Sequence, residues 1–114
     1  MLRLAIALSF ALPLVAAAGH RVSISGRYDS NYDEVRLAQD GDRVFGTYVC
    51  CGGGTIDGRI FDGRTIRYHW KQPDREGMGV WTIKGDKLLG TWGLDQDDDD
   101  GGRWDLTRTA EVAQ

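Results

Sequence analysis

The sequence predicts an all-β fold, an eight-stranded antiparallel up-and-down β-barrel. The first observation behind this prediction is a repeated unit in which a glycine and a large residue lie two positions apart, so that both point to the same face of a strand. The unit occurs at Gly26-Arg-Tyr28, Gly46-Thr-Tyr48, Gly79-Val-Trp81, Gly90-Thr-Trp92 and Gly102-Arg-Trp104, with Gly58-Arg-Ile60 as an aliphatic variant. The second is composition: the 114 residues include 16 glycines and only 2 prolines, which favours short strands joined by turns.

The third observation is alternation of apolar and polar residues, which gives each expected strand a single apolar face. An open sheet of such strands would leave two unprotected edges and a bare apolar surface. Closure into a barrel removes both problems, and the interior of an eight-stranded barrel is filled by side chains or holds one small ligand. A sandwich of two sheets is the alternative architecture.

The alternation predicts the strands in chain order. In the first half, the expected strands and their inward residues are 21–28 (Val22, Ile24, Gly26, Tyr28), 34–38 (Val35, Leu37), 43–50 (Val44, Gly46, Tyr48, Cys50) and 55–61 (Ile56, Gly58, Ile60). In the second half they are 64–71 (Ile66, Tyr68, Trp70), 78–84 (Gly79, Trp81, Ile83), 87–93 (Trp92) and 101–108 (Trp104, Leu106). Pro73 ends the fifth strand because proline cannot donate to a sheet ladder.

The connections predict two different ends of the barrel. Those after the even strands are tight Asp/Gly turns, whereas those after the odd strands are longer and cover residues 29–33, 50–54, 72–77 and 94–101. In an up-and-down barrel all connections after odd strands lie at one end. We therefore expect the two cysteines and the acidic run to meet there, on the kind of loops that carry binding residues.

The first 18 residues have the pattern of a secretory signal peptide. Arg3 precedes an apolar run that ends at Ala18, with small residues at Ala16 and Ala18. The run is shorter than the roughly 20 residues of a spanning helix, so no membrane span is expected. Residues 19–114 then form one domain of a secreted or periplasmic protein. Its net charge changes from −3 to −4 because residues 1–18 include one basic and no acidic residue.

Several strand motifs are similar to those of calycin-like barrels of the avidin type. They are Phe45-Gly-Thr-Tyr48, Asp57-Gly-Arg-Ile60, Tyr68-His-Trp-Lys71, Gly90-Thr-Trp92 and Trp104-Asp-Leu-Thr-Arg108. The resemblance implies an architecture that often binds a ligand. No set of biotin-contacting polar residues matches, so it does not imply biotin. The chain also resembles short secreted bacterial domains with Gly-Thr-Tyr and Gly-Thr-Trp motifs.

Catalytic motifs are absent from the sequence, and we expect no enzyme and no catalytic residues. Of the two histidines, His20 lies beside the expected cleavage point, and His69 points outward between Arg67 and Lys71 with no base partner. Nucleophile elbows, phosphate-binding loops and zinc-spaced ligands are missing. The acidic balance also argues against nucleic-acid binding, which needs a basic surface.

Cys50 and Cys51 are adjacent, and three states stay open for them: a vicinal disulfide, free thiols or an intermolecular bridge. An oxidising compartment favours a bond. Adjacent Cα atoms lie about 3.8 Å apart, below the usual disulfide range of about 4.4–6.8 Å, so a vicinal bond would be easily reduced.

The acidic run at residues 95–100 could hold calcium, but its spacing does not favour this cofactor. With Gly101 as the sixth residue of a calcium loop, Thr107 takes the twelfth position, where a bidentate glutamate is required. We therefore expect no metal and no cofactor. The residues expected to bind a partner are Asp95, Asp97, Asp98, Asp99, Asp100, Asp74, Glu76 and Tyr32, and a pocket lined by Tyr48, Tyr68, Trp70, Trp81, Trp92 and Trp104 is the other candidate site.

The charge distribution predicts function. The odd-numbered connections and their flanks carry ten acidic residues against Lys71 and Arg75, and such a field attracts cationic partners. The sequence thus predicts a monomeric, non-enzymatic binding module that engages a cationic protein or small ligand, with inhibition of a basic enzyme as one form. The alternatives are a structural or stress-related envelope protein and a small-molecule carrier that uses the tryptophan-lined interior.

Overall fold

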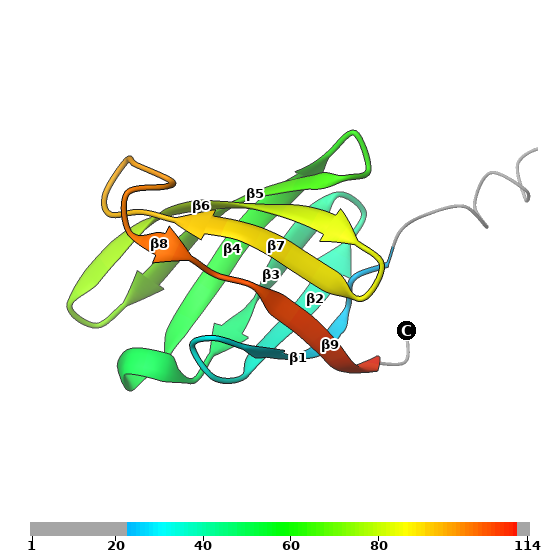
Figure 1. The fold of residues 1–114 in the computed structure, drawn as a ribbon, viewed down its shortest axis with the longest axis horizontal. Helices are drawn as coiled ribbons and strands as arrows, with labels where there is room; N and C mark the ends of the chain where they lie inside the picture. The colour runs from blue at the N-terminus through cyan, green and yellow to red at the C-terminus, as the bar shows by residue number, and fades with distance from the viewer. Residues whose placement is uncertain (1–22, 112–114) are drawn as a thin grey trace, which may run out of the picture.

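Strands account for most of the computed structural model, which describes residues 23–111 (Figure 1). In chain order they are β1 (Gly26–Ser30), β2 (Val35–Asp40), β3 (Arg43–Tyr48), β4 (Gly54–Phe61), β5 (Thr65–Gln72), β6 (Arg75–Lys84), β7 (Lys87–Trp92), β8 (Gly102–Arg103) and β9 (Leu106–Glu111), with one 3₁₀ turn at Cys50–Gly52. The expected signal peptide, residues 1–18, lies outside the described residues.

The strands close into an antiparallel eight-stranded barrel, as the sequence predicted. Each strand from β1 to β7 pairs with the next one. β9 then pairs with both β1 and the start of β7, which closes the sheet. β8 pairs with the end of β7, so β8 and β9 together form the eighth strand of the barrel. The single closed sheet excludes the sandwich alternative.

The eighth strand is broken into β8 and β9 by Trp104 and Asp105. The backbone at this break remains bonded to β7, because the Trp104 N–H donates to the Gly90 carbonyl at 2.9 Å. The Gly90 N–H in turn donates to the Asp105 carboxylate at 3.0 Å. Side-chain and backbone bonds thus replace the regular ladder where the Trp104 ring turns into the interior.

Several strand boundaries differ from the prediction: β2 continues to Asp40, and β9 continues to Glu111, three residues past the expected end of the last strand. β1 runs later than expected, to Ser30, and β3 ends at Tyr48, two residues short of Cys50. β6 begins at Arg75, so the expected 72–77 connection shrinks to a turn of two residues, Pro73 and Asp74. The inward positions at the start of β6 are Arg75 and Gly77. Because neither is a large apolar residue, the alternation in the sequence did not mark this part of the strand.

Aromatic rings fill the middle of the barrel. Tyr68 and Trp81 are almost fully buried and stack with their ring centroids 4.0 Å apart. Trp104 packs edge-on against both, at 5.8 and 5.4 Å, and its carbonyl accepts the Trp81 indole N–H at 3.0 Å. The tight-turn end is filled instead by aliphatic side chains, among them Val44, Ile66, Leu88 and Leu106.

Inward glycines make room for the rings on neighbouring strands. A Cβ atom at Gly79 would overlap the ring of Tyr68, and one at Gly77 would overlap the Gly93 carbonyl oxygen and lie 2.9 Å from the ring of Trp70. Gly79 thus follows a packing rule in which a position without a side chain on one strand faces a ring on the next. Gly46 and Gly90 of the same repeated unit instead let the backbone of the neighbouring strand approach closely, because a Cβ atom there would overlap a carbonyl oxygen.

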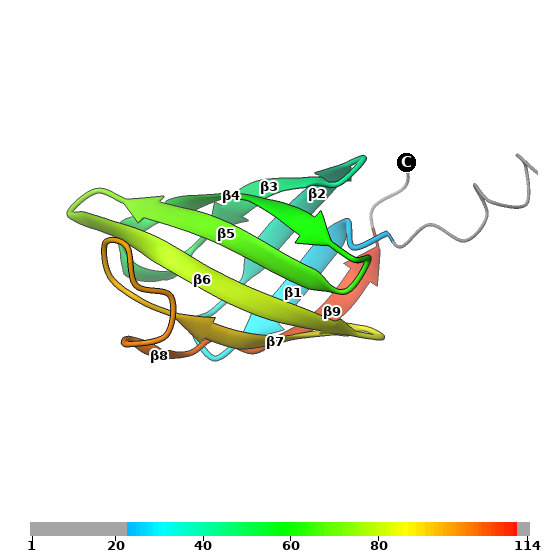
Figure 2. The same cartoon turned by 90° about the horizontal axis from the view of Figure 1, so that it is seen from above.

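The two ends of the barrel differ in the way predicted from the connections. Figures 1 and 2 show the tight turns after β2, β4 and β6 at one end and the connections after β1, β3, β5 and β7 at the other. We call these the tight end and the open end. The Cys50–Gly52 turn and the acidic connection between β7 and β8 both lie at the open end.

Replacing Gly79 with alanine tests the packing rule. The added methyl group would overlap the Tyr68 ring, and overpacking a closed core costs about 1–3 kcal/mol. We expect the free energy of unfolding, measured by urea denaturation, to fall by about this amount. In a Tyr68→Ala background the same change should cost much less, and equal costs in both backgrounds would contradict the rule.

Candidate functional site

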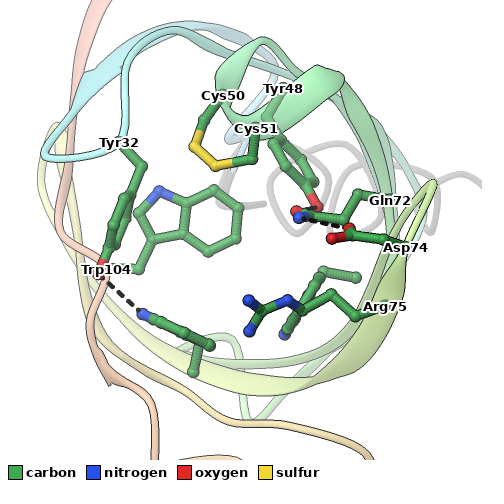
Figure 3. Close-up of a pocket in the computed structure, with 10 residues that line it drawn as sticks. Tyr32, Tyr48, Cys50, Cys51, Gln72, Asp74, Arg75 and Trp104 are labelled. Carbon is green, nitrogen blue, oxygen red and sulfur yellow. Dashed lines mark hydrogen bonds between the residues drawn. A yellow bond between two sulfur atoms is a disulfide. The ribbon is translucent and has the colours of Figure 1, made fainter.

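A pocket of about 360 Å³ opens at the open end of the barrel (Figure 3). Its lining residues come from strands that are distant in sequence. The walls are the rings of Tyr32, Tyr48, Trp70, Trp92 and Trp104, and the rest of the lining is Cys50, Cys51, Gln72, Asp74 and Arg75. The pocket is therefore mainly aromatic, with three polar side chains and one disulfide at its edge.

Strand alternation directs these side chains inward. Trp70 and Gln72 lie two residues apart on β5, and Tyr48 and Trp92 are the last residues of β3 and β7. Tyr32 comes from the connection between β1 and β2. Its ring meets Trp92 and Trp104 edge-on, with centroids 6.0 and 6.2 Å apart, and so forms one side wall.

The indole N–H groups of the walls are already bonded within the protein. Trp70 Nε1 donates to the Gly93 carbonyl at 3.1 Å, and Trp104 Nε1 donates to Ser30 Oγ at 3.1 Å. Trp92 Nε1 donates to the Tyr32 hydroxyl at 3.3 Å. The tryptophan walls consequently offer a ligand apolar ring surface instead of free donors, a lining typical of small-molecule pockets.

One wall carries a chain of polar side chains. The Tyr48 hydroxyl donates to Gln72 Oε1 at 2.9 Å, and Gln72 Nε2 donates to Asp74 Oδ1 at 3.3 Å. Burial, with the nearby Asp74 carboxylate as the second cause, raises the pKa of Tyr48 to about 12. Tyr48 therefore stays neutral at physiological pH, and both Gln72 and Asp74 already accept a hydrogen bond.

A disulfide joins Cys50 to Cys51 at the rim of the pocket, which is one of the three states that the sequence left open. Both cysteines lie in the 3₁₀ turn, so Cys50, contrary to expectation, is not part of β3. Cys51, Gly52 and Gly53 follow one another with φ of 67°, 91° and 87°, in the left-handed region that favours glycine. This reversal carries the chain into β4 and keeps the sulfur atoms beside the pocket.

Two predicted pocket residues do not line the pocket. Tyr68 and Trp81 are closed off beneath it, and the Tyr68 hydroxyl donates to the Thr91 carbonyl at 3.0 Å. Burial, with smaller contributions from Asp98 and Tyr48, raises the pKa of Tyr68 far above its usual value. These two residues belong to the core, whereas the other four predicted pocket residues line the pocket. Tyr32 and Asp74, predicted to bind a partner together with the acidic run, line the pocket as well.

The acidic run lies at the open end but does not line the pocket. It folds against the outer wall, where the Asp98 carbonyl accepts Thr91 Oγ1 at 2.9 Å and the Asp98 carboxylate lies 3.6 Å from the Arg67 guanidinium. Asp100 accepts the Leu94 N–H at 3.0 Å. Asp98 and Asp100 thus have side-chain contacts outside the run, and none of its five aspartates lines the aromatic pocket.

Crowding of like charges affects Asp97. The charge of Asp100 and a hydrogen bond to it raise the pKa of Asp97, and Asp99 and Asp98 add to the effect. Residues 23–111 contain no group of three or more His, Cys, Asp or Glu side chains placed to hold a metal ion. The expectation that calcium is disfavoured stays a prediction.

Glu76, another predicted binding residue, lies on the outer wall away from the pocket. Its carboxylate is 3.3 Å from His69 Nε2, so the expectation that His69 has no partner was wrong. The pair forms because His69 and Glu76 are near neighbours across β5 and β6, where Lys71 pairs with Glu76 and His69 with Met78. The early start of β6 creates this contact.

Gln72 and Arg75 are pocket residues that the sequence analysis did not assign to it. Both were placed in a loop, because the expected sixth strand began only at residue 78. Extending the alternation of Gly77, Gly79 and Trp81 back by one step would have turned Arg75 inward. The alternation therefore continues to Arg75, but none of the inward residues before Trp81 is apolar and large enough to reveal a strand.

No family model, curated protein or solved structure matches the chain. The resemblance to calycin-like barrels therefore rests on the strand motifs alone. Among residues 23–111, no helix has the length and apolar character needed to cross a membrane.

The disulfide gives a prediction about the thiols. Closing a loop between adjacent residues constrains the unfolded chain very little, so dithiothreitol should reduce the bond while the barrel stays folded. Alkylation followed by mass spectrometry should find no free thiol before reduction and two afterwards, with unchanged near-ultraviolet circular dichroism. A Cys50→Ser, Cys51→Ser double variant serves as the control and should also fold. Loss of the folded signal on reduction alone would contradict this account.

Proposed function

We propose that this chain is a non-enzymatic binding protein that takes a small, flat, mainly apolar ligand into the aromatic pocket at the open end. The observation that carries the proposal is the set of five rings around the pocket, whose tryptophan N–H groups are all bonded within the protein. Such walls favour a ligand that offers ring or hydrocarbon surface over one that needs many hydrogen bonds.

The size and surroundings of the pocket support this proposal. Its volume of about 360 Å³ lies at the lower end of the range of about 300–1,000 Å³ that is usual for small-molecule sites. Tyr68, Trp81 and the aliphatic residues below are packed together, so a ligand would occupy the mouth and not the length of the barrel. This modifies the carrier hypothesis, in which the whole interior was available.

The proposed location is the periplasm or the extracellular space. Two features support it: the apolar leader pattern of the sequence, and a disulfide, which persists in oxidising compartments. A structural envelope protein would share this location, but that role would not use the aromatic pocket.

Replacing Tyr32 with alanine should weaken ligand binding roughly fivefold, because an aromatic contact contributes about 0.5–1.5 kcal/mol. The probe is 3-methylindole, a neutral flat ring, and binding is followed by quenching of the tryptophan fluorescence. Phe45→Ala is the matched control, because Phe45 is a partly exposed ring on the outer wall.

Native mass spectrometry of protein taken from its own compartment complements this titration by revealing a retained small molecule. The proposal would fail if neither 3-methylindole nor a charged relative of it changed the fluorescence, or if Phe45→Ala weakened binding as much as Tyr32→Ala.

A second candidate function is binding of a cationic protein by the acidic run, for example inhibition of a basic secreted enzyme. The observation that favours it is the arrangement of the run: Asp95, Asp97, Asp99 and Asp100 are exposed in one connection at the open end. Their crowding, with Asp100 as the first cause, raises the pKa of Asp97, and a bound cation would relieve it. The Asp98 and Asp100 carboxylates also contact Arg67 and the Leu94 N–H.

An Asp97→Asn, Asp99→Asn double variant tests this candidate while keeping the Asp98 and Asp100 carboxylates, which contact Arg67 and the Leu94 N–H. Affinity for a basic enzyme such as lysozyme, measured by calorimetry, should decrease in the variant and decrease with added salt in the original protein. An Asp40→Asn, Asp62→Asn variant removes the same charge from the tight end and should bind as before. Salt-independent affinity, or equal loss in both variants, would exclude the acidic run as the binding surface.

A further inference from the structure

Arg75 occupies an inward position at the start of β6. It lies on the same face of the strand as Gly77, Gly79 and Trp81, and its partner across the sheet is Gln72 on β5. Figure 3 shows its side chain extending across the mouth of the pocket, opposite the disulfide turn. The guanidinium group therefore faces the space that a ligand would enter.

The carboxylates near Arg75 are bonded to other side chains. Asp74 accepts a hydrogen bond from Gln72, and Glu76 pairs with His69 on the outer face. Within residues 23–111, the Arg75 guanidinium has no ion pair or side-chain hydrogen bond. Six other arginines do pair with a carboxylate: Arg36, Arg43, Arg59, Arg67, Arg103 and Arg108.

An unpaired guanidinium at the edge of an aromatic pocket is suited to one kind of group. Its planar set of donors matches a carboxylate in a two-point, charge-assisted contact. Tyr32 adds a further donor, because its hydroxyl oxygen accepts from Trp92 and its own proton remains available.

We infer that the ligand of this pocket is anionic, with a flat ring held by the aromatic walls and a carboxylate bound by Arg75. The inference rests on the proposed function and specifies the chemical class of its ligand. It differs from the sequence expectation of a cationic ligand, which was based on the number of acidic residues and not on which of them face the pocket.

The acidic residues of the open end do not cancel this preference. The Asp98 carboxylate lies against Arg67 on the outer wall. The Asp74 carboxylate lines the pocket and keeps its charge, but it is engaged by the Gln72 amide on the wall that also holds Tyr48. Charges exposed to water are screened over about 8 Å at physiological salt, whereas a carboxylate on Arg75 would sit at hydrogen-bond distance. The direct contact therefore outweighs the surrounding field, which would slow the arrival of an anion more than it would weaken its binding.

Three ring compounds of similar size test the inference: 3-methylindole is neutral, indole-3-acetate is anionic and tryptamine is cationic. Their dissociation constants are measured by fluorescence and calorimetry with the original protein, Arg75→Gln and Lys71→Gln. Lys71 is the matched control, because it carries the same charge at the same end but lies exposed on β5, between the inward Trp70 and Gln72.

We expect indole-3-acetate to bind on the order of tenfold more tightly than the other two compounds, as for a hydrogen bond to a charged group. Arg75→Gln should reduce its affinity to that of 3-methylindole, and Lys71→Gln should retain the preference. Equal binding of all three compounds, or tightest binding of tryptamine, would overturn the inference and leave the proposed function intact. If none of the three binds, the proposed function fails and the inference fails with it.

Discussion

Packing of rings inside a narrow closed sheet is the constraint on which the rest of this structure depends. An eight-stranded barrel has little interior space, and here Tyr68, Trp81 and Trp104 occupy its centre in direct ring contact. Glycines make room for some of these rings, as Gly79 does for Tyr68, and for close approach of neighbouring backbones, as Gly46 and Gly90 do. The repeated Gly-x-aromatic unit combines the two, because its glycine and its large residue lie two positions apart and share one face of the strand.

The same constraint explains why a pocket lies at one end only. Aliphatic side chains such as Val44 and Leu88 fill the end where the turns are tight. At the other end the last inward residues include tyrosines and tryptophans, whose rings line the pocket. Their polar atoms bond to each other or to the backbone, so the rings are held at the mouth without covering it.

Charge at the open end is divided between two surfaces by the direction of the strands. The acidic connection after β7 turns outward, where Arg67 neutralises part of it, and the start of β6 turns Arg75 inward. A surface that is acidic by residue count thus surrounds a pocket whose lining carries one acidic and one basic side chain, Asp74 and Arg75. Residue counts along a connection cannot distinguish these surfaces, because adjacent positions on a strand point to opposite sides.

The sequence alone determined the strand class, the positions of most strands, the inward residues and the two unlike ends, because these follow from local alternation and turn chemistry. It did not decide between a barrel and a sandwich, since closure depends on β9 reaching both β1 and β7. It also did not separate core rings from pocket rings, because Trp81 and Trp92 belong to the same repeated unit and differ only in depth. The bond between Cys50 and Cys51 and the inward position of Arg75 likewise required the tertiary structure. Both features depend on where a strand ends or begins: β3 ends before the cysteines, and β6 begins at Arg75. Where the alternation of apolar and polar residues is weak, pairing with a neighbouring strand determines these boundaries.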